Sequence, residues 1–163
     1  MDTKNLKIRK PCADDGVALH QLIQQCPPLD LNSTYLYLLQ TTHFAETCVV
    51  AELDGQPSAF LSGYIKPGTR DTFFLWQVAV GDALRGQGMA KQLIDAVLNR
   101  EACRDVKYLE TTITPDNEAS WALFRSFARD RHASLEDAVF FTREQLGGEH
   151  DPEVLVRIGP FNN

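Results

Sequence analysis

The sequence predicts a single α/β domain over residues 1–163, with a mixed β-sheet and flanking helices, and three observations support this fold class. First, 163 residues are enough for one domain with its own hydrophobic core. Second, short runs of β-branched and aromatic residues are interspersed with stretches whose apolar residues recur every three or four positions. Third, the order hairpin, strand, helix, strand, helix, strand is typical of an α/β domain.

The first part of the chain is predicted to form three strands and two helices. Proline and Asp-Gly pairs mark their boundaries, and Asp, Asn and Ser residues stand where helix caps are expected. The expected elements are a strand at 6–9, a helix after Asp14 or Asp15 that ends at 26–28, a helix from about 33 to 43, and a hairpin of 47–53 and 58–65.

The centre of the chain has the clearest pattern. Residues 72–80 (TFFLWQVAV) read as a strand, in which Phe74, Trp76, Val78 and Val80 alternate along one side. From residue 89 the period changes to that of an amphipathic helix, with apolar residues four positions apart. A glycine-bearing turn, RGQGMA at 85–90, joins the strand to this helix.

The last part of the chain is predicted to contribute three more strands and one more helix. A capping-box spacing also predicts one helical turn after the second of these strands. The expected elements are a strand at 107–114, a helix at 118–128 with Ala119, Leu123 and Phe127 facing inward, a short strand at 138–141, a turn at 142–145 and a final strand at 154–158.

The turn at 85–90 has the chemistry of an anion site, because the first N–H groups of a helix lack intrahelical partners and glycine admits a large anion. A Walker loop would need Gly-Lys-Ser/Thr, which is absent, and a dinucleotide fingerprint would need Gly or Ala where Lys91 stands. Arg85, Gly88 and Ala90 match a third pattern, Arg/Gln-x-x-Gly-x-Gly/Ala. An ordinary glycine-containing turn is the alternative for these six residues alone.

The composition of the chain argues against some classes of binding partner and favours one cellular compartment. Sixteen basic and twenty-two acidic residues give a net charge of −6, without a basic cluster, which argues against nucleic acid and anionic membranes. No apolar run approaches the roughly 18 residues of a membrane span. The four cysteines are scattered, so we expect buried thiols and a reducing cytoplasm rather than disulfides or zinc. The four histidines share no ligand spacing, and no metal is expected.

With these residues in view, positions 72–128 resemble the GNAT superfamily of N-acetyltransferases. The pattern Arg/Gln-x-x-Gly-x-Gly/Ala, which the turn at 85–90 matches, is that of the coenzyme A pyrophosphate loop of that superfamily. Its usual Asn-x-x-Ala-x-x-Leu-Tyr continuation resembles Asn117, Ser120, Leu123 and Phe124 here. Asn117 is then expected to help hold coenzyme A, although Asn at a helix start is also an ordinary cap. Phe124 stands where many relatives have a tyrosine that protonates the leaving thiolate, so that role is empty or filled elsewhere.

The resemblance extends over nearly the whole chain to the L-2,4-diaminobutyrate acetyltransferases of ectoine biosynthesis. It rests on stretches such as PPLDLNS, DTFFLWQVAV, YLETTITPDN and the terminal RIGPF. It implies a mixed, mostly antiparallel sheet flanked by helices, and transfer of acetyl from acetyl-CoA to the γ-amine of diaminobutyrate. A homodimer is expected at the level of the family. The alternatives are a GNAT enzyme acting on another small amine or a protein N-terminus, and a non-catalytic acetyl-CoA-binding module.

The resemblance also assigns roles to residues. The pantetheine arm is expected along the strand from Trp76 to Val80, with the N–H of Val78 donating to the thioester carbonyl. One such donor is typically worth about 2.7–4 kcal/mol in kcat. The expected cofactor-binding residues are Val78, Val80, Arg85, Gly86, Gln87, Gly88, Met89, Ala90 and Asn117.

A substrate with two amines calls for carboxylates in its pocket. Asp30, Glu110 and Glu153 are the candidates, the two glutamates also as catalytic groups beside Val78. Their structural alternatives are a helix cap for Asp30, a solvated strand face for Glu110 and a loop carboxylate for Glu153. Tyr35 and Trp76 are candidates for the pocket wall, or else for the core. The general base is left open.

Overall fold

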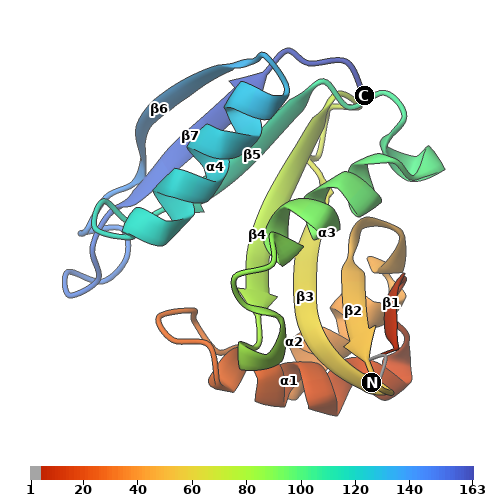
Figure 1. Ribbon diagram of the computed structural model, residues 1–163. Helices are drawn as coiled ribbons and strands as arrows, with labels where there is room; N and C mark the ends of the chain where they lie inside the picture. Colours follow the sequence, from red (N-terminus) through yellow and green to blue (C-terminus); the bar gives the residue numbers. More distant parts are fainter. Residues whose placement is uncertain (1–4) are drawn as a thin grey trace. The chain divides into compact units, whose positions relative to one another are not determined.

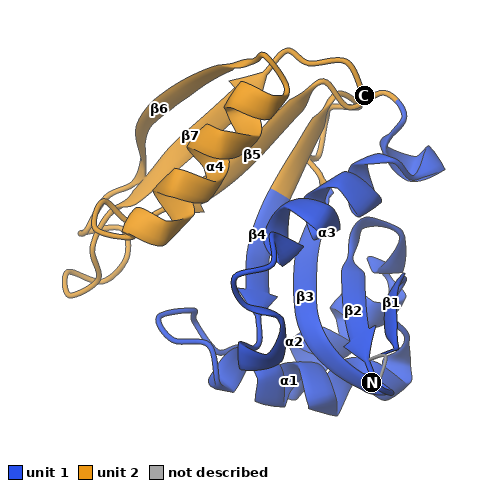
Figure 2. Cartoon of the chain, viewed as in Figure 1, with its two compact units in different colours: residues 1–64, 75–104 blue, residues 65–74, 105–163 orange. Residues whose placement is uncertain are grey.

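The computed structural model describes residues 5–163, which fall into two compact units (Figure 2). Within the described residues, the first unit contains 5–64 and 75–104, and the second contains 65–74 and 105–163. Strand β4 (Thr72–Val80) begins in the second unit and continues into the first. That residues 1–163 form one cooperative domain stays a prediction, which the division into two units leaves untested.

The first unit contains four strands in the order β1-β2-β3-β4. Strand β2 pairs antiparallel with both β1 and β3, and the β2–β3 turn uses Asp54 and Gly55 at positive φ, as the Asp-Gly pair predicts. Figure 1 shows α3 crossing in front of β3. The elements besides β4 are β1 (Leu6–Arg9), α1 (Gly16–Gln24), α2 (Thr34–Thr42), β2 (Val49–Leu53), β3 (Gln56–Ile65) and α3 (Met89–Leu98).

The second unit holds the start of β4 followed in the sheet by β5, β7 and β6. Strand β7 lies between its two antiparallel neighbours, with Leu109 of β5 and Leu135 of β6 both opposite Ile158. In Figure 1, α4 runs along the face of β5 and β7. The elements are β5 (Tyr108–Ile113), α4 (Glu118–Asp130), β6 (Ser134–Phe141) and β7 (Glu153–Gly159).

Most predicted elements are present, and some of their bounds and buried faces differ from the expectation. The side of β4 that holds Phe74, Trp76, Val78 and Val80 is the less buried one, since the residues between them are buried. The predicted inner face of α4 is wrong at Ala119, which is exposed, because the helix buries Phe124, Phe127 and Ala128. Strand β6 starts at Ser134 instead of residue 138, because its pairing with β7 extends over polar residues.

Three of the four cysteines are buried, as expected, while Cys12 is exposed. All four thiols are free, and burial raises the pKa of Cys48 and of Cys103 to about 11. Among residues 5–163, no helix is long and apolar enough to cross a lipid bilayer.

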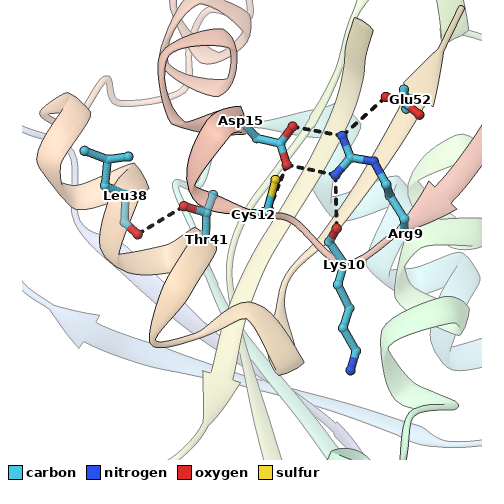
Figure 3. A network of polar contacts seen from close by, with 7 residues as sticks. All are labelled: Arg9, Lys10, Cys12, Asp15, Leu38, Thr41 and Glu52. Carbon is cyan, nitrogen blue, oxygen red and sulfur yellow. Dashed lines mark hydrogen bonds and ion pairs between the residues drawn. The ribbon is translucent and has the colours of Figure 1, made fainter. Parts of the chain in front are cut away.

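A network of polar contacts joins β1, the short 3-10 helix at Ala13–Asp15 and β2 (Figure 3). The guanidinium of Arg9 donates to both carboxylate oxygens of Asp15, at 2.8 Å each, and lies 3.5 Å from Glu52. The main-chain N–H of Cys12 also donates to Asp15, at 2.8 Å. The hydrogen bonds from Arg9, against the opposing effect of burial, lower the pKa of Asp15 below its ordinary 3.8.

Candidate active site

The turn between β4 and α3 is built on two glycines in the left-handed region. Gly86 has φ +76° and Gly88 has φ +69°, a conformation in which other residues are strained. Gly88 is also the N-cap of α3, so the cap residue has no side chain to accept hydrogen bonds from the first turn of the helix. The start of α3 therefore offers N–H groups and the positive end of a helix dipole to an anion.

The side chains of this turn hold the turn itself together. Arg85 donates from Nε to the main-chain oxygen of Val80 at 3.2 Å and pairs with Asp82 at 2.7 Å. Gln87 donates to the oxygen of Ala83 at 3.3 Å. Arg85, expected to contact the cofactor, thus fixes the turn to the end of β4, while its side chain stays half exposed.

Along β4, where the pantetheine arm is expected, the side that carries Trp76, Val78 and Val80 is the more exposed one. Trp76 is 41% exposed and packs edge-on against Tyr64 with ring centroids 6.2 Å apart, so it is not a core residue. Val78 and Val80 are half-buried. Between Trp76 and Val78, the buried Gln77 donates its main-chain N–H to the hydroxyl of Ser62 at 3.2 Å.

Residues 26–33, called here the acceptor segment, connect α1 to α2 in the same unit. Ser33, and not Asp30, caps α2 by accepting a hydrogen bond from the N–H of Leu36 at 3.1 Å. Asp30 is exposed, and its main-chain oxygen accepts from Gln77 Nε2 at 2.7 Å. Tyr35, in the first turn of α2, is 69% exposed and is therefore not part of the core. Asp30 and Tyr35 both lie where a ligand can reach them.

Glu110 lies in the second unit and is only 2% exposed, so it is not on a solvated strand face. Lys66 Nζ lies 2.9 Å from one of its carboxylate oxygens, and Arg157 lies 2.8 Å from the other. The Arg157 guanidinium also sits over the ring of Tyr108, 3.8 Å from its centre. Both oxygens of Glu110 are therefore occupied by cationic donors.

Asn117 and Glu153 also belong to the second unit. Asn117 is the N-cap of α4 and accepts from the N–H of Ser120 at 3.2 Å, which is the ordinary role of Asn at this position. Glu153 begins β7 and is half-buried. Phe124 is buried at 2% exposure. Within residues 5–163, no group of three His, Cys, Asp or Glu side chains could hold a metal ion.

Within the first unit, the structure joins the acceptor segment to β4 through a residue that the sequence reasoning did not select, Gln77. A signal was present in the pattern, because Gln77 is the polar residue among Phe73, Leu75 and Ala79 on the buried side of the strand. The Lys66 and Arg157 partners of Glu110 had no comparable signal, since they lie 44 and 47 positions away in the chain.

Comparisons with known proteins show which family the chain resembles. The model of the acetyltransferase (GNAT) family matches residues 17–128. The L-2,4-diaminobutyric acid acetyltransferase of Chromohalobacter salexigens is 56% identical over 97% of this chain and 83% of its own length. That of Halomonas elongata is 54% identical over 96% of this chain and 82% of its own length.

A solved structure is similar over the whole chain. Diaminobutyrate acetyltransferase EctA from Paenibacillus lautus, in complex with L-2,4-diaminobutyric acid and coenzyme A, has a TM-score of 0.93 and 37% identity. The match covers 99% of this chain and 98% of that one. The predicted fold class, a mixed sheet flanked by helices, is confirmed. The chain therefore belongs to the GNAT acetyltransferase family and, within it, to the L-2,4-diaminobutyric acid acetyltransferases.

Proposed function

We propose that this chain transfers the acetyl group of acetyl-CoA to the γ-amine of L-2,4-diaminobutyrate, and that the product, N-γ-acetyldiaminobutyrate, enters ectoine synthesis. The observation that carries the proposal is the similarity, over almost the full length of both chains, to an enzyme whose structure contains diaminobutyric acid and coenzyme A. The exposed, glycine-capped start of α3 supports the same reaction, because a pyrophosphate fits there.

In this proposal, β4 and α3 bind the cosubstrate. The main-chain N–H groups of residues 88–90 donate hydrogen bonds to the pyrophosphate, and the glycines of the turn at 85–88 let the pyrophosphate come close to the backbone. The pantetheine arm follows the open side of β4, where Val80 is half-buried. The N–H of Val78 donates to the thioester carbonyl, which gains negative charge as the amine attacks.

The acceptor is held by a carboxylate and aromatic side chains. Asp30 holds the α-ammonium of diaminobutyrate and keeps it charged, because a nearby anion favours the cationic form of an amine. Tyr35 and Trp76, both largely exposed, form the wall of the pocket. The γ-amine is then selected by orientation toward the thioester rather than by its basicity.

Removal of a proton from the attacking amine is the step that requires a side chain as a base. A primary amine with a pKa of about 10.4 is neutral in less than ~0.1% of molecules at pH 7, so a group must accept its proton. Glu153 and Glu110 are the candidates for this role, and cationic donors occupy both oxygens of Glu110. The thiolate of coenzyme A, with a thiol pKa of about 8.5, leaves without the tyrosine that Phe124 replaces.

Release of free thiol from acetyl-CoA tests the proposal, with diaminobutyrate, lysine and an N-terminal peptide as separate acceptors. Turnover should be fastest with diaminobutyrate, and NMR of the product should show acetylation at the γ-nitrogen. Faster turnover of lysine or of the peptide would indicate another GNAT substrate. Acetyl-CoA binding without turnover of any acceptor would indicate a binding module.

We also propose that the enzyme works in the cytoplasm as a homodimer. Four free cysteines fit a reducing compartment. Strand β6 is an edge strand whose Val139, Phe140 and Phe141 are exposed, and such edges commonly pair with a second chain. Light scattering should give the mass of two chains, and the mass of one chain would contradict the dimer.

A further inference from the structure

The side chain of Gln77 links β4 to the acceptor segment, residues 26–33. Gln77 is 7% exposed, and both the nitrogen and the oxygen of its side-chain amide make hydrogen bonds. Nε2 donates to the main-chain oxygen of Asp30 at 2.7 Å, and Oε1 accepts from the hydroxyl of Tyr37 at 3.4 Å. Both partners are more than 39 residues away in the chain, so the contact is tertiary and not a local turn.

Tyr37 makes a second hydrogen bond to the same segment. Its hydroxyl, which donates to Gln77, accepts from the main-chain N–H of Asn32 at 3.3 Å. The ring is 0% exposed and packs edge-on against Phe60 and His20. A phenol hydroxyl donates one hydrogen bond and can accept others, so Tyr37 can accept from Asn32 while it donates to Gln77. Gln77 must then place its amide oxygen toward Tyr37 and its amide nitrogen toward Asp30. Two main-chain groups of the acceptor segment, at Asp30 and Asn32, are thus held by one buried pair of side chains.

Gln77 is also fixed on the strand side. Its own N–H donates to Ser62 Oγ, which is fully buried. The next residue is Val78, whose N–H is proposed to donate to the thioester carbonyl. One rigid residue therefore joins the segment that carries Asp30 to the backbone where acetyl transfer takes place.

We propose that Gln77 is a positioning residue for acetyl transfer: it sets the place of Asp30, and of the bound amine, relative to the thioester at Val78. This inference rests on the proposed function. Loss of the Nε2 donor leaves the Asp30 carbonyl without this partner and lets the segment shift. A misplacement of about 1 Å can lower a rate on the order of 100-fold.

Gln77→Met tests the proposal, because methionine keeps the length of the side chain and removes both hydrogen bonds. KM for diaminobutyrate should rise about tenfold and kcat should fall, while calorimetric titration of acetyl-CoA should show less than a twofold change in affinity. Tyr37→Phe removes only the hydroxyl, and should give a smaller change in the same direction.

Thr47→Val is the matched control for loss of a buried hydrogen bond in the same unit. Its hydroxyl donates to the main-chain oxygen of Gly63 at 2.7 Å, away from the acceptor segment. The control should lower the melting temperature to a similar degree and leave KM for diaminobutyrate unchanged. Equal KM values in Gln77→Met, Tyr37→Phe and the control would overturn the positioning role.

Hydrogen exchange separates this inference from the proposed function. Amides of residues 29–33 should exchange faster in Gln77→Met and in Tyr37→Phe than in Thr47→Val, whichever acceptor the enzyme uses. If diaminobutyrate is not a substrate but this difference appears, only the assigned acceptor is wrong. If diaminobutyrate is turned over and exchange at 29–33 is the same in all variants, Gln77 does not hold the segment. Should Gln77→Met fail to fold, Tyr37→Phe decides by the same two measurements.

Discussion

Asp15 shows how a single residue makes stability depend on pH. Its carboxylate accepts two hydrogen bonds from Arg9 and one from the N–H of Cys12, and its pKa is lowered in the folded state. A lowered folded pKa means that the stabilisation is fully present above the unfolded value of about 3.8. It declines as the pH falls below the unfolded pKa and is lost as the pH falls through the folded pKa.

Asp15→Asn should therefore lower the free energy of unfolding at pH 7, by roughly 1.5–3 kcal/mol for hydrogen bonds to a charged group. The loss should shrink as the pH falls below about 4, because the unfolded wild-type chain then binds a proton at Asp15 that the folded chain still excludes. Urea denaturation at a series of pH values measures both effects. Asp14→Asn is the control, since Asp14 is its exposed neighbour in the same 3-10 helix. A loss that is independent of pH would contradict the role of the charge.

At this scale the sequence predicted the exposure of single residues better than their contacts. Asp30, Tyr35 and Trp76 were selected as ligand-facing residues, and all three are exposed. The hydrogen bonds of the Gln77 side chain and the ion pairs of Glu110 were not foreseen, because each joins positions at least 40 apart in the chain. Pattern within a window of a dozen residues carries no information on such partners.

At the scale of elements, a substitution in the turn between β4 and α3 can distinguish the cost of backbone strain from the loss of ligand binding. A Cβ built on Gly88 meets nothing within 4 Å, so a substitution there would not clash within the protein. The cost inside the protein is the left-handed conformation alone, roughly 1–2 kcal/mol. Any further effect must come from a ligand that occupies the space in front of the glycine.

Gly88→Ala should bind acetyl-CoA about tenfold more weakly or worse, which corresponds to ~1.4 kcal/mol. Gly55→Ala is the matched control, because Gly55 has φ +84°, also meets nothing within 4 Å, and lies in the β2–β3 turn. Both variants should lose similar stability in thermal melts, and only the first should lose affinity in calorimetric titration. Equal affinity in the two variants would place the pyrophosphate elsewhere.

The elements themselves were predicted with uneven success, and the reason is physical. Strand β4 has the predicted bounds, 72–80, because its composition and its flanking loops agree. Strand β6 was predicted four residues too short, because Ser134, Glu136 and Asp137 are polar and exposed. Their strand conformation comes from hydrogen bonding to β7, from Ser134 opposite Gly159 onward. Tertiary pairing there overrides local propensity.

At the scale of the whole molecule, the two compact units raise the question of how many cooperative units unfold. Strand β4 supplies residues to both, with 72–74 in the second unit and 75–80 in the first. If the first unit unfolds, β4 keeps only residues 72–74 in folded surroundings, which is the short limit of strand length; if the second unfolds, β4 loses its first three residues. We therefore expect the chain to unfold as one cooperative domain, as a single domain of this length commonly does.

Each unit contains one of the two tryptophans, Trp76 in the first and Trp121 in the second, so fluorescence can report on each separately. In Trp76→Phe the signal comes from Trp121, and in Trp121→Phe it comes from Trp76. Each variant changes the overall stability, since Trp121 donates a hydrogen bond to the main-chain oxygen of Thr114. The comparison is therefore made within one variant, between fluorescence and far-ultraviolet circular dichroism. In urea the two curves should coincide for both variants, and a fluorescence midpoint that departs from the circular dichroism midpoint in either one would mean that the two units unfold independently.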